Sequence, residues 1–395
     1  MYLRLTGWRP NPVLDAAVFG VAVLAAGFML SWGAEAAESR VSQGLMLACL
    51  ALVTVLPEYA VDIYYAWRAG QTPGSDYIHY AAANMTGANR LLVGLGWPLI
   101  VFLNWWKRRE SAVALFETNK IELFFLVLAS AYAFVILFKN RIDLFDFVAL
   151  LAIFGGYMWR VSRLSKPDAA LGDSDDDEGE ELGPAAILET LTPRLQWAWT
   201  AGLTMVAGAI ILLSAEPFAE SMVGAGRALG IDEFLLIQWV APLTGESPEI
   251  LLAILFVMAA RPGSGLIALI SDKINQWTLL VGALPVAMSV GAGSLVALPL
   301  SARQHEEFFL TAAQSLFGIA LLLRLRLGLR GAFALATLFA IQVVLAFVFQ
   351  RDPVREITAL TTLGWIYLIL ALGVFAMGLP GLLRRSGAGS SSAAA

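Results

Sequence analysis

Two segments of the chain are built alike, and each places a glutamate inside an apolar run. The first reads Thr-Val-Leu-Pro-Glu and ends at Glu58, and the second reads Gly-Glu-Ser-Pro-Glu and ends at Glu249. Polar, asparagine-bearing residues follow in both, and then Leu-Leu-Val-Gly at residues 91–94 and 279–282. A charge near the centre of a bilayer costs about 3 kcal/mol or more. Two such charges at matching places indicate an ion site between internal repeats.

The proline before each glutamate suits these segments to cation binding. Pro57 and Pro248 each remove a backbone donor and clash with the carbonyl one turn earlier, which leaves that oxygen free. With a carboxylate and a hydroxyl such as that of Thr54, it forms the hard-oxygen environment that Ca²⁺ or Na⁺ prefers. The alternative is a protonated glutamate that hydrogen-bonds between helices, but the repetition of the pattern favours an ion site.

Three asparagines are candidates for the same coordination shell, because an amide oxygen adds a ligand without adding charge. Asn84 follows Glu58, and Asn275 follows Glu249, by the same twenty-six positions. Asn89 is another candidate in the first half. Aligning the two halves on Leu-Leu-Val-Gly, rather than on the glutamates, no longer matches Asn84 with Asn275. The alternative for all three is hydrogen bonding between helices. Which first-half asparagine corresponds to Asn275 stays open.

The second polar stretch adds Ser271, Asp272 and Lys273. Asp272 is either a third carboxylate of the site or the partner of Lys273. Lys273 and Arg90 are basic residues deep in apolar spans, next to the proposed site. Each either reaches an interface or forms a structural ion pair. Our hypothesis is that one of them replaces a bound monovalent ion in part of the transport cycle.

Two further acidic residues lie one helical turn from the central glutamates. Glu246 precedes Glu249, and Asp62 follows Glu58. Either could share the cavity or carry protons, but a polar contact between helices is the favoured role. The acidic run at 173–181 lacks the pattern of a calcium-binding loop, so it is interpreted as a solvated linker.

Composition places the chain in a membrane. Hydrophobic residues make up 58% and charged residues 14%, whereas soluble domains carry about 25% charged residues. The single cysteine excludes an internal disulfide, and two histidines leave little scope for a histidine metal cage. No P-loop, zinc or dinucleotide signature is present. We therefore expect no cofactor and no enzymatic activity, and transport driven by an ion gradient rather than by ATP.

The apolar segments predict an all-α polytopic membrane protein with about ten or eleven transmembrane helices. The two glutamate spans are the second and the seventh, and this odd separation makes the two five-helix halves inverted repeats. The spans near 77–105 and 265–300 are too long for plain helices and contain Gly, Asn, Ser and Asp. We expect these helices to be broken at the ion site. The predicted spans are 13–34, 43–67, 77–105, 120–138, 143–162, 195–216, 232–259, 265–300, 306–325, 331–350 and 358–382.

The domain organisation follows from these spans. We expect a first membrane repeat at 1–163, an acidic cytoplasmic linker at 164–193, a second repeat at 194–350, and an extra helix with a disordered tail at 351–395. Lys and Arg concentrate in loops on one side, which predicts an outside N-terminus. The expected location is the cell (inner) membrane, with the lipid bilayer and transported cations as partners and no nucleic acid.

At the level of motifs the chain resembles the calcium/cation antiporter superfamily, which includes the sodium/calcium exchangers. That family repeats Gly-Thr-Ser-x-Pro-Glu, followed by Gly-Ser-Asn-x-x-Asn or Asp, in two inverted halves of five helices. The resemblance covers 43–105 and 232–300 by motif and the remainder by helix count.

The resemblance implies specific roles. Glu58 and Glu249 correspond to the ligands of the central divalent ion, Asn275 to the second-repeat ligand, Ser271 to the sodium-site serine and Thr54 to the first-repeat threonine. The chain departs from the motif where Val55 and Glu246 stand in place of serines, and where Arg90 and Lys273 are foreign to it.

The expected function is therefore secondary active antiport, with Ca²⁺ exchanged for Na⁺ or H⁺ through a site between Glu58 and Glu249. Two alternatives come from other classes of protein. One is a cation channel or ion sensor without coupled exchange, and the other is an intramembrane enzyme that uses paired carboxylates.

Overall fold

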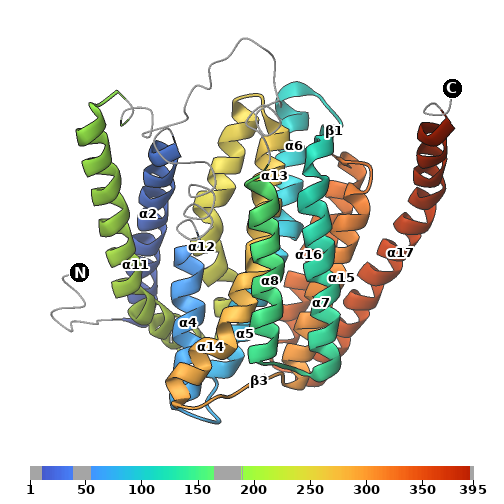
Figure 1. Cartoon of the computed structure of the whole chain (residues 1–395). Coiled ribbons are helices and arrows are strands. Elements are labelled where there is room, and N and C mark those ends of the chain that lie inside the picture. Colours follow the sequence, from blue (N-terminus) through green and yellow to red (C-terminus); the bar gives the residue numbers. More distant parts are fainter. Residues whose placement is uncertain (1–10, 39–54, 164–187, 189, 392–395) are drawn as a thin grey trace.

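The computed structural model describes residues 11–38, 55–163, 188 and 190–391, and helices make up most of it. The helices run between two faces of the molecule (Figure 1). Those before residue 164 are α2 (Pro12–Glu38), α4 (Leu56–Gln71), α5 (Tyr77–Leu91), α6 (Trp97–Arg108), α7 (Lys120–Lys139) and α8 (Leu144–Val161). Those after it are α11 (Pro193–Leu229), α12 (Glu233–Met258), α13 (Pro262–Asn275), α14 (Val281–Ala292), α15 (Ala302–Leu322), α16 (Leu329–Phe349) and α17 (Pro353–Ser391).

These helices confirm the predicted all-α membrane fold. Nine helical stretches in the described part of the chain are long and apolar enough to cross a bilayer. The other two predicted spans correspond to α4 and α15. Sixteen residues of α4 are described, and α15 carries Arg303, Glu306 and Glu307 in its first two turns. Because α15 packs against α5, α7 and α17, its polar side chains are enclosed by protein rather than lipid.

The connections between helices repeat in the two halves. Strand β1 (Ala112–Ala114) after α6 pairs with β4 (Arg326–Gly328) after α15. Strand β2 (Arg141–Ile142) after α7 pairs with β3 (Leu298–Pro299) after α14. In each half, the third connection follows the third span and the fourth connection follows the fourth span. Each two-stranded ribbon therefore pairs the third connection of one half with the fourth connection of the other. This reciprocal pairing is what a two-fold axis in the membrane plane produces, and it supports the inverted arrangement.

The two long spans are interrupted by π-helical segments. Residues Leu92–Gly96 (η1) link α5 to α6, and Gln276–Leu280 (η3) link α13 to α14. The interruption is milder than two separate half-helices meeting at mid-membrane, because the chain stays helical through it. A π-helical turn keeps backbone groups bonded within the segment, as the water-free bilayer interior requires. Such turns frequently lie at functional sites.

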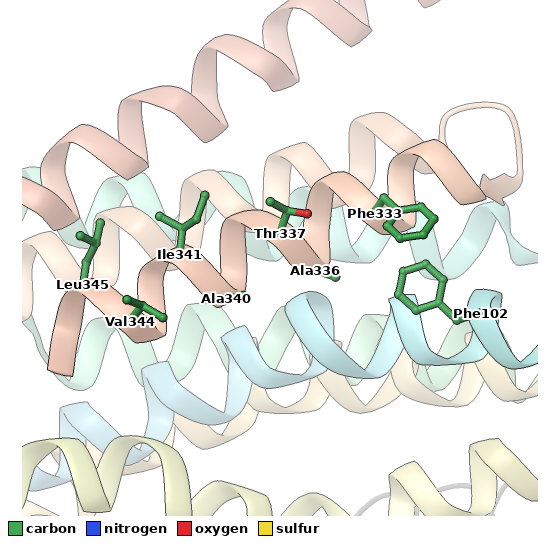
Figure 2. A pocket seen from close by; sticks show the side chains of 8 residues that line it. All are labelled: Phe102, Phe333, Ala336, Thr337, Ala340, Ile341, Val344 and Leu345. Atoms are coloured by element: carbon green, nitrogen blue, oxygen red, sulfur yellow. The ribbon is translucent and has the colours of Figure 1, made fainter. Parts of the chain in front are cut away.

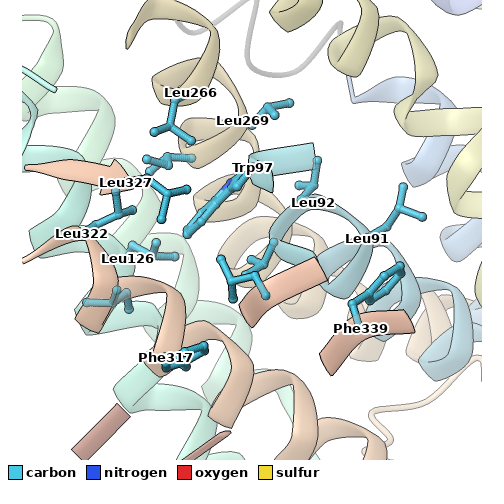
Figure 3. Close-up of a cluster of buried hydrophobic side chains, with 14 of the residues drawn as sticks. Leu91, Leu92, Trp97, Leu126, Leu266, Leu269, Phe317, Leu322, Leu327 and Phe339 are labelled. Carbon is cyan, nitrogen blue, oxygen red and sulfur yellow. The ribbon is translucent and has the colours of Figure 1, made fainter. Parts of the chain in front are cut away.

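The two halves interlock at the centre of the molecule. Helix α4 packs on α14, α12 packs on α5, and α2 packs along α11 at one edge of the bundle (Figure 1). On the far side of the bundle from α2, Trp97 is fully buried among leucines from several helices, including Leu126, Leu266 and Leu322 (Figure 3). This apolar cluster fixes α6, α13 and α15 relative to one another, and so holds the polar stretch of α13 in place.

Candidate ion-binding site

Three glutamates from the two halves converge between α4 and α12. Glu58 of α4 and Glu246 and Glu249 of α12 each bring one carboxylate oxygen to within 4.8 Å of the others. The exposed fraction is 3% for Glu58 and 0% for Glu246, and Glu249 is half-buried. Three buried charges of one sign repel strongly at this distance. A cation, or protons, must therefore compensate them.

The local sequence explains how these carboxylates reach one place. Glu58 lies in the first turn of α4, at the helix end whose dipole favours a negative charge. Glu246 and Glu249 are three residues apart and share one face of α12. A Cβ added to Gly245 would meet the carboxylate of Glu58, so the glycine leaves room for that carboxylate to lie against α12. Pro248 frees the backbone carbonyl of Thr244, one turn earlier in the same helix.

The carboxylate oxygens are available for a ligand. Among the described residues, no other residue donates a hydrogen bond to either oxygen of Glu58 or Glu249, and one oxygen of Glu246 is also without a donor. The other oxygen of Glu246 accepts a hydrogen bond from Nε2 of Gln276. Buried charges are normally paired or bound to a metal. Carboxylate oxygens grouped in this way match the ligands that Ca²⁺ takes.

Helix α13 closes the site with two of the predicted residues. Asp272 is half-buried, interacts electrostatically with all three glutamates, and lies within hydrogen-bonding reach of Glu246. Asn275 accepts a 2.8 Å hydrogen bond from the hydroxyl of Tyr59, the neighbour of Glu58. Both residues therefore adjoin the glutamate cluster, which we define as Glu58, Glu246 and Glu249.

Other predicted ligands form separate contacts. Nδ2 of Asn84 donates to Asp62 at 2.9 Å, and Ser271 accepts a 2.9 Å hydrogen bond from the hydroxyl of Tyr157. The side-chain oxygen of Asn89 accepts from Lys273 at 3.1 Å. None of these hydrogen-bond partners belongs to the glutamate cluster. Thr54 falls outside the described residues.

The two deep basic residues are fully buried, so neither reaches an interface. Arg90 forms an ion pair with Glu307 of α15 and lies 5.1 Å from the ring centre of Trp239. Lys273 donates to the backbone and side-chain oxygens of Asn89 at 3.2 and 3.1 Å, and it interacts electrostatically with Glu246. Arg90 is therefore a structural ion-pair residue, whereas Lys273 adds a positive charge beside the glutamate cluster.

For Glu246 the sequence favours a polar contact between helices, and the residue makes one with Gln276. The structure also brings it together with Glu58 and Glu249. The available signal was its spacing of three residues from Glu249, which puts both on one helix face.

Comparisons with known proteins identify the family of the chain. The model of the sodium/calcium exchanger protein family matches residues 13–163 and 199–348. No match was found among curated proteins. A solved structure of the H⁺/Ca²⁺ exchanger CAX is 39% identical, with a TM-score of 0.87 over 97% of this chain and 92% of that chain.

Two structures of the sodium-calcium exchanger NCX_Mj share the fold. They are 20% and 17% identical, with TM-scores of 0.53 and 0.54, and each match covers 84% of this chain and 99% of the other. The family match and the 39% identity agree with the motifs and with the interlocked halves. The chain belongs to the sodium/calcium exchanger protein family and is a multi-pass membrane transporter rather than an enzyme.

Proposed function

We propose that the chain exchanges Ca²⁺ for protons, and that both compete for the glutamate cluster. The convergence of three carboxylates, two of them without a hydrogen-bond donor from another described residue, carries this proposal. When a divalent ion leaves such a cluster, the remaining charges repel, and protons are the simplest compensation. Binding of the metal then displaces the protons, because a carboxylate must be deprotonated to ligate.

Protons are a better match to this site than Na⁺. Glu246 stands where the exchanger motif has a serine, and Val55 replaces another. The hydroxyl of Ser271 is held by Tyr157. An acidic side chain and an apolar one thus stand where the motif has neutral oxygen ligands. The 39% identity to a protein described as an H⁺/Ca²⁺ exchanger supports the same choice.

The function can be tested by radiolabelled Ca²⁺ uptake into proteoliposomes. Three arms are compared: an acid-inside pH gradient, a Na⁺-loaded lumen at equal pH, and a Ca²⁺ gradient alone. We expect uptake only in the first arm. Uptake driven by Na⁺ alone would contradict proton coupling. Uptake in all three arms would favour a channel. The absence of uptake in every arm would exclude Ca²⁺ exchange as the function.

We further propose that Lys273 replaces a bound monovalent cation beside the cluster. Its side chain is fully buried, interacts electrostatically with Glu246 and donates a hydrogen bond to Asn89. Removing this charge in Lys273→Met should tighten apparent Ca²⁺ affinity several-fold and change the net charge moved per cycle, because repulsion of the incoming cation is lost. Concentration-dependent uptake and charge measurements on proteoliposomes test this, with Lys107→Met as the control. Unchanged affinity and unchanged charge movement would contradict the role.

Movement of the α2–α11 pair is the proposed route to alternating access. This pair lies at the edge of the bundle (Figure 1), and α2 also packs against α12 and α4, the helices that carry the two proline–glutamate elements. A Cβ on Gly27 would lie 2.8 Å from Cγ of Pro248 and 3.6 Å from Cγ of Pro57. Gly27 therefore marks the contact at which we propose that the pair slides past both halves of the site.

Gly27→Ala should slow transport while leaving Ca²⁺ binding largely intact. Overpacking costs about 1–3 kcal/mol, which corresponds to about five- to 150-fold in rate if it acts on the sliding step. Maximal uptake rate and Ca²⁺ binding are measured separately. Gly20→Ala is the matched control, since Gly20 faces Phe218 within the pair rather than the site. Equal effects of the two substitutions would argue against sliding at Gly27.

We propose that the protein lies in the cell (inner) membrane with its acidic linker in the cytoplasm. The Lys and Arg distribution supports this orientation of the chain. Protease cleavage of the linker in inside-out but not right-side-out vesicles is expected. The reverse pattern would overturn the orientation.

A further inference from the structure

A groove opens on the outer side of the bundle between α6 and α16, away from the glutamate cluster. It has a volume of about 470 Å³ and is lined by Phe102 of α6 and a stripe of α16 that runs from Phe333 to Leu345 (Figure 2). The lining contains one hydroxyl, that of Thr337, and is otherwise apolar. It lies on a membrane-spanning helix, so its surroundings are the bilayer.

Small side chains create the groove. Ala336 and Ala340 lie one turn apart on the lining face of α16, between the ring of Phe333 and the branched side chain of Val344. From Phe333 to Leu345 the helix rises by twelve residue steps, or about 18 Å at 1.5 Å per residue. One leaflet of the hydrocarbon core is about 15 Å deep, half of the 30 Å total. The groove therefore has the length and the chemistry of one lipid acyl chain.

The groove points outward rather than into the protein. The exposed fraction is 57% for Phe333, 42% for Ile341 and 59% for Val344. The ring centres of Phe102 and Phe333 are 4.8 Å apart, which forms a wall at one end. Side chains this exposed on a membrane helix contact lipid.

That walled end carries positive charge. Arg330 precedes Phe333 by three residues, so it lies one turn further along the same face of α16. Arg326 lies in β4, directly before this helix. Both are exposed, and the ion pairs within the described residues involve neither. On α6, Trp105 and Trp106 are 42% and 66% exposed one turn beyond Phe102. Exposed tryptophans mark the headgroup level of a membrane.

We propose that this groove is a binding site for an anionic phospholipid. One acyl chain lies along Ala336 and Ala340, and the phosphate group is bound by Arg326 and Arg330. Charge complementarity favours an anionic lipid. Two arginines without an acidic partner lie at the end of the apolar groove, at the depth of the lipid headgroups. Basic pockets between transmembrane helices on the cytoplasmic side take such lipids, and our predicted topology puts both arginines on that side.

Thermal unfolding of the purified full chain in detergent tests this proposal. Phosphatidylglycerol and phosphatidylcholine with identical acyl chains are added separately, and native mass spectrometry counts retained lipids. We expect phosphatidylglycerol to raise the unfolding midpoint by about 2–5 °C more than phosphatidylcholine, since only it is bound through the arginines. The double variant Arg326→Gln/Arg330→Gln should lose this difference.

Two further variants separate the parts of the site. Ala340→Trp fills the groove and should remove the retained lipid, even though both arginines remain. Arg355→Gln, at an exposed arginine that already pairs with Asp352, should leave the lipid difference unchanged. Equal stabilisation of the wild type by both lipids would overturn the proposal. So would a dimer that Ala340→Trp disrupts, because that would make the groove an interface between copies of the chain.

Discussion

Glu249→Gln is expected to lower Ca²⁺ affinity at least about a thousandfold and to reduce proton-driven uptake to background. The substitution keeps the shape of the side chain but removes one charge from the glutamate cluster. Two unit charges 4 Å apart interact by about 4 kcal/mol at an effective dielectric constant of 20, and 1.4 kcal/mol is a factor of ten. A divalent ion doubles the attraction, so the estimate is a lower bound.

Radiolabelled uptake and equilibrium Ca²⁺ binding measure this loss. Glu58→Gln should behave in the same way, since it removes the corresponding charge from the other half. Glu117→Gln makes the same chemical change at an exposed residue that pairs with Lys120, and should leave transport intact. If Glu249→Gln keeps affinity within tenfold of the wild type, the glutamate cluster is not the transport site.

Breaking the buried Arg90–Glu307 pair should destabilise the protein strongly, by about 3–5 kcal/mol. Arg90 is fully buried and Glu307 is 1% exposed, so removal of one partner leaves an uncompensated charge. Arg90→Met and Glu307→Gln should each lower the midpoint of thermal unfolding in detergent. The double variant Arg90→Met/Glu307→Leu should recover much of the loss, because no lone charge remains.

An exposed ion pair provides the comparison. Arg355 and Asp352 pair at the start of α17 with exposed fractions of 73% and 44%, and such pairs contribute about 0–1 kcal/mol. Disrupting that pair should therefore leave the unfolding midpoint nearly unchanged. If the double variant at Arg90 and Glu307 is as unstable as the single ones, the pair acts through packing and not through charge.

The sequence predicted the fold well because membrane burial leaves a strong pattern. Long apolar segments marked the spans, and the repeated proline–glutamate pairs marked the pseudo-symmetry. The form of the two helix interruptions was harder to predict from the sequence. Whether a Gly- and Asn-bearing span breaks or forms a π-helical turn depends on neighbouring helices, here α16 against η1 and α8 against η3. The two short ribbons between the halves also join segments far apart in sequence.

The site was predicted in part, for a similar reason. Glu58 and Glu249 stood out by position, and their convergence follows from the inverted halves. Asn89 shows the limit, because its oxygen is occupied by Lys273, a contact between helices that no spacing rule reveals. The sequence shows Glu246 on the same helix face as Glu249 but does not decide its role. A carboxylate on a buried helix face serves equally as a ligand or as a partner for Gln276.

Proton release on Ca²⁺ binding is the most direct test of the claim that one cluster serves both ions. Purified protein in weakly buffered detergent at neutral pH is titrated with Ca²⁺ while a pH dye records released protons. We expect at least about one proton per bound Ca²⁺, no release when Na⁺ is added, and no release from Glu249→Gln. Ca²⁺ binding at full affinity without proton release would contradict the competition on which the proposed exchange rests.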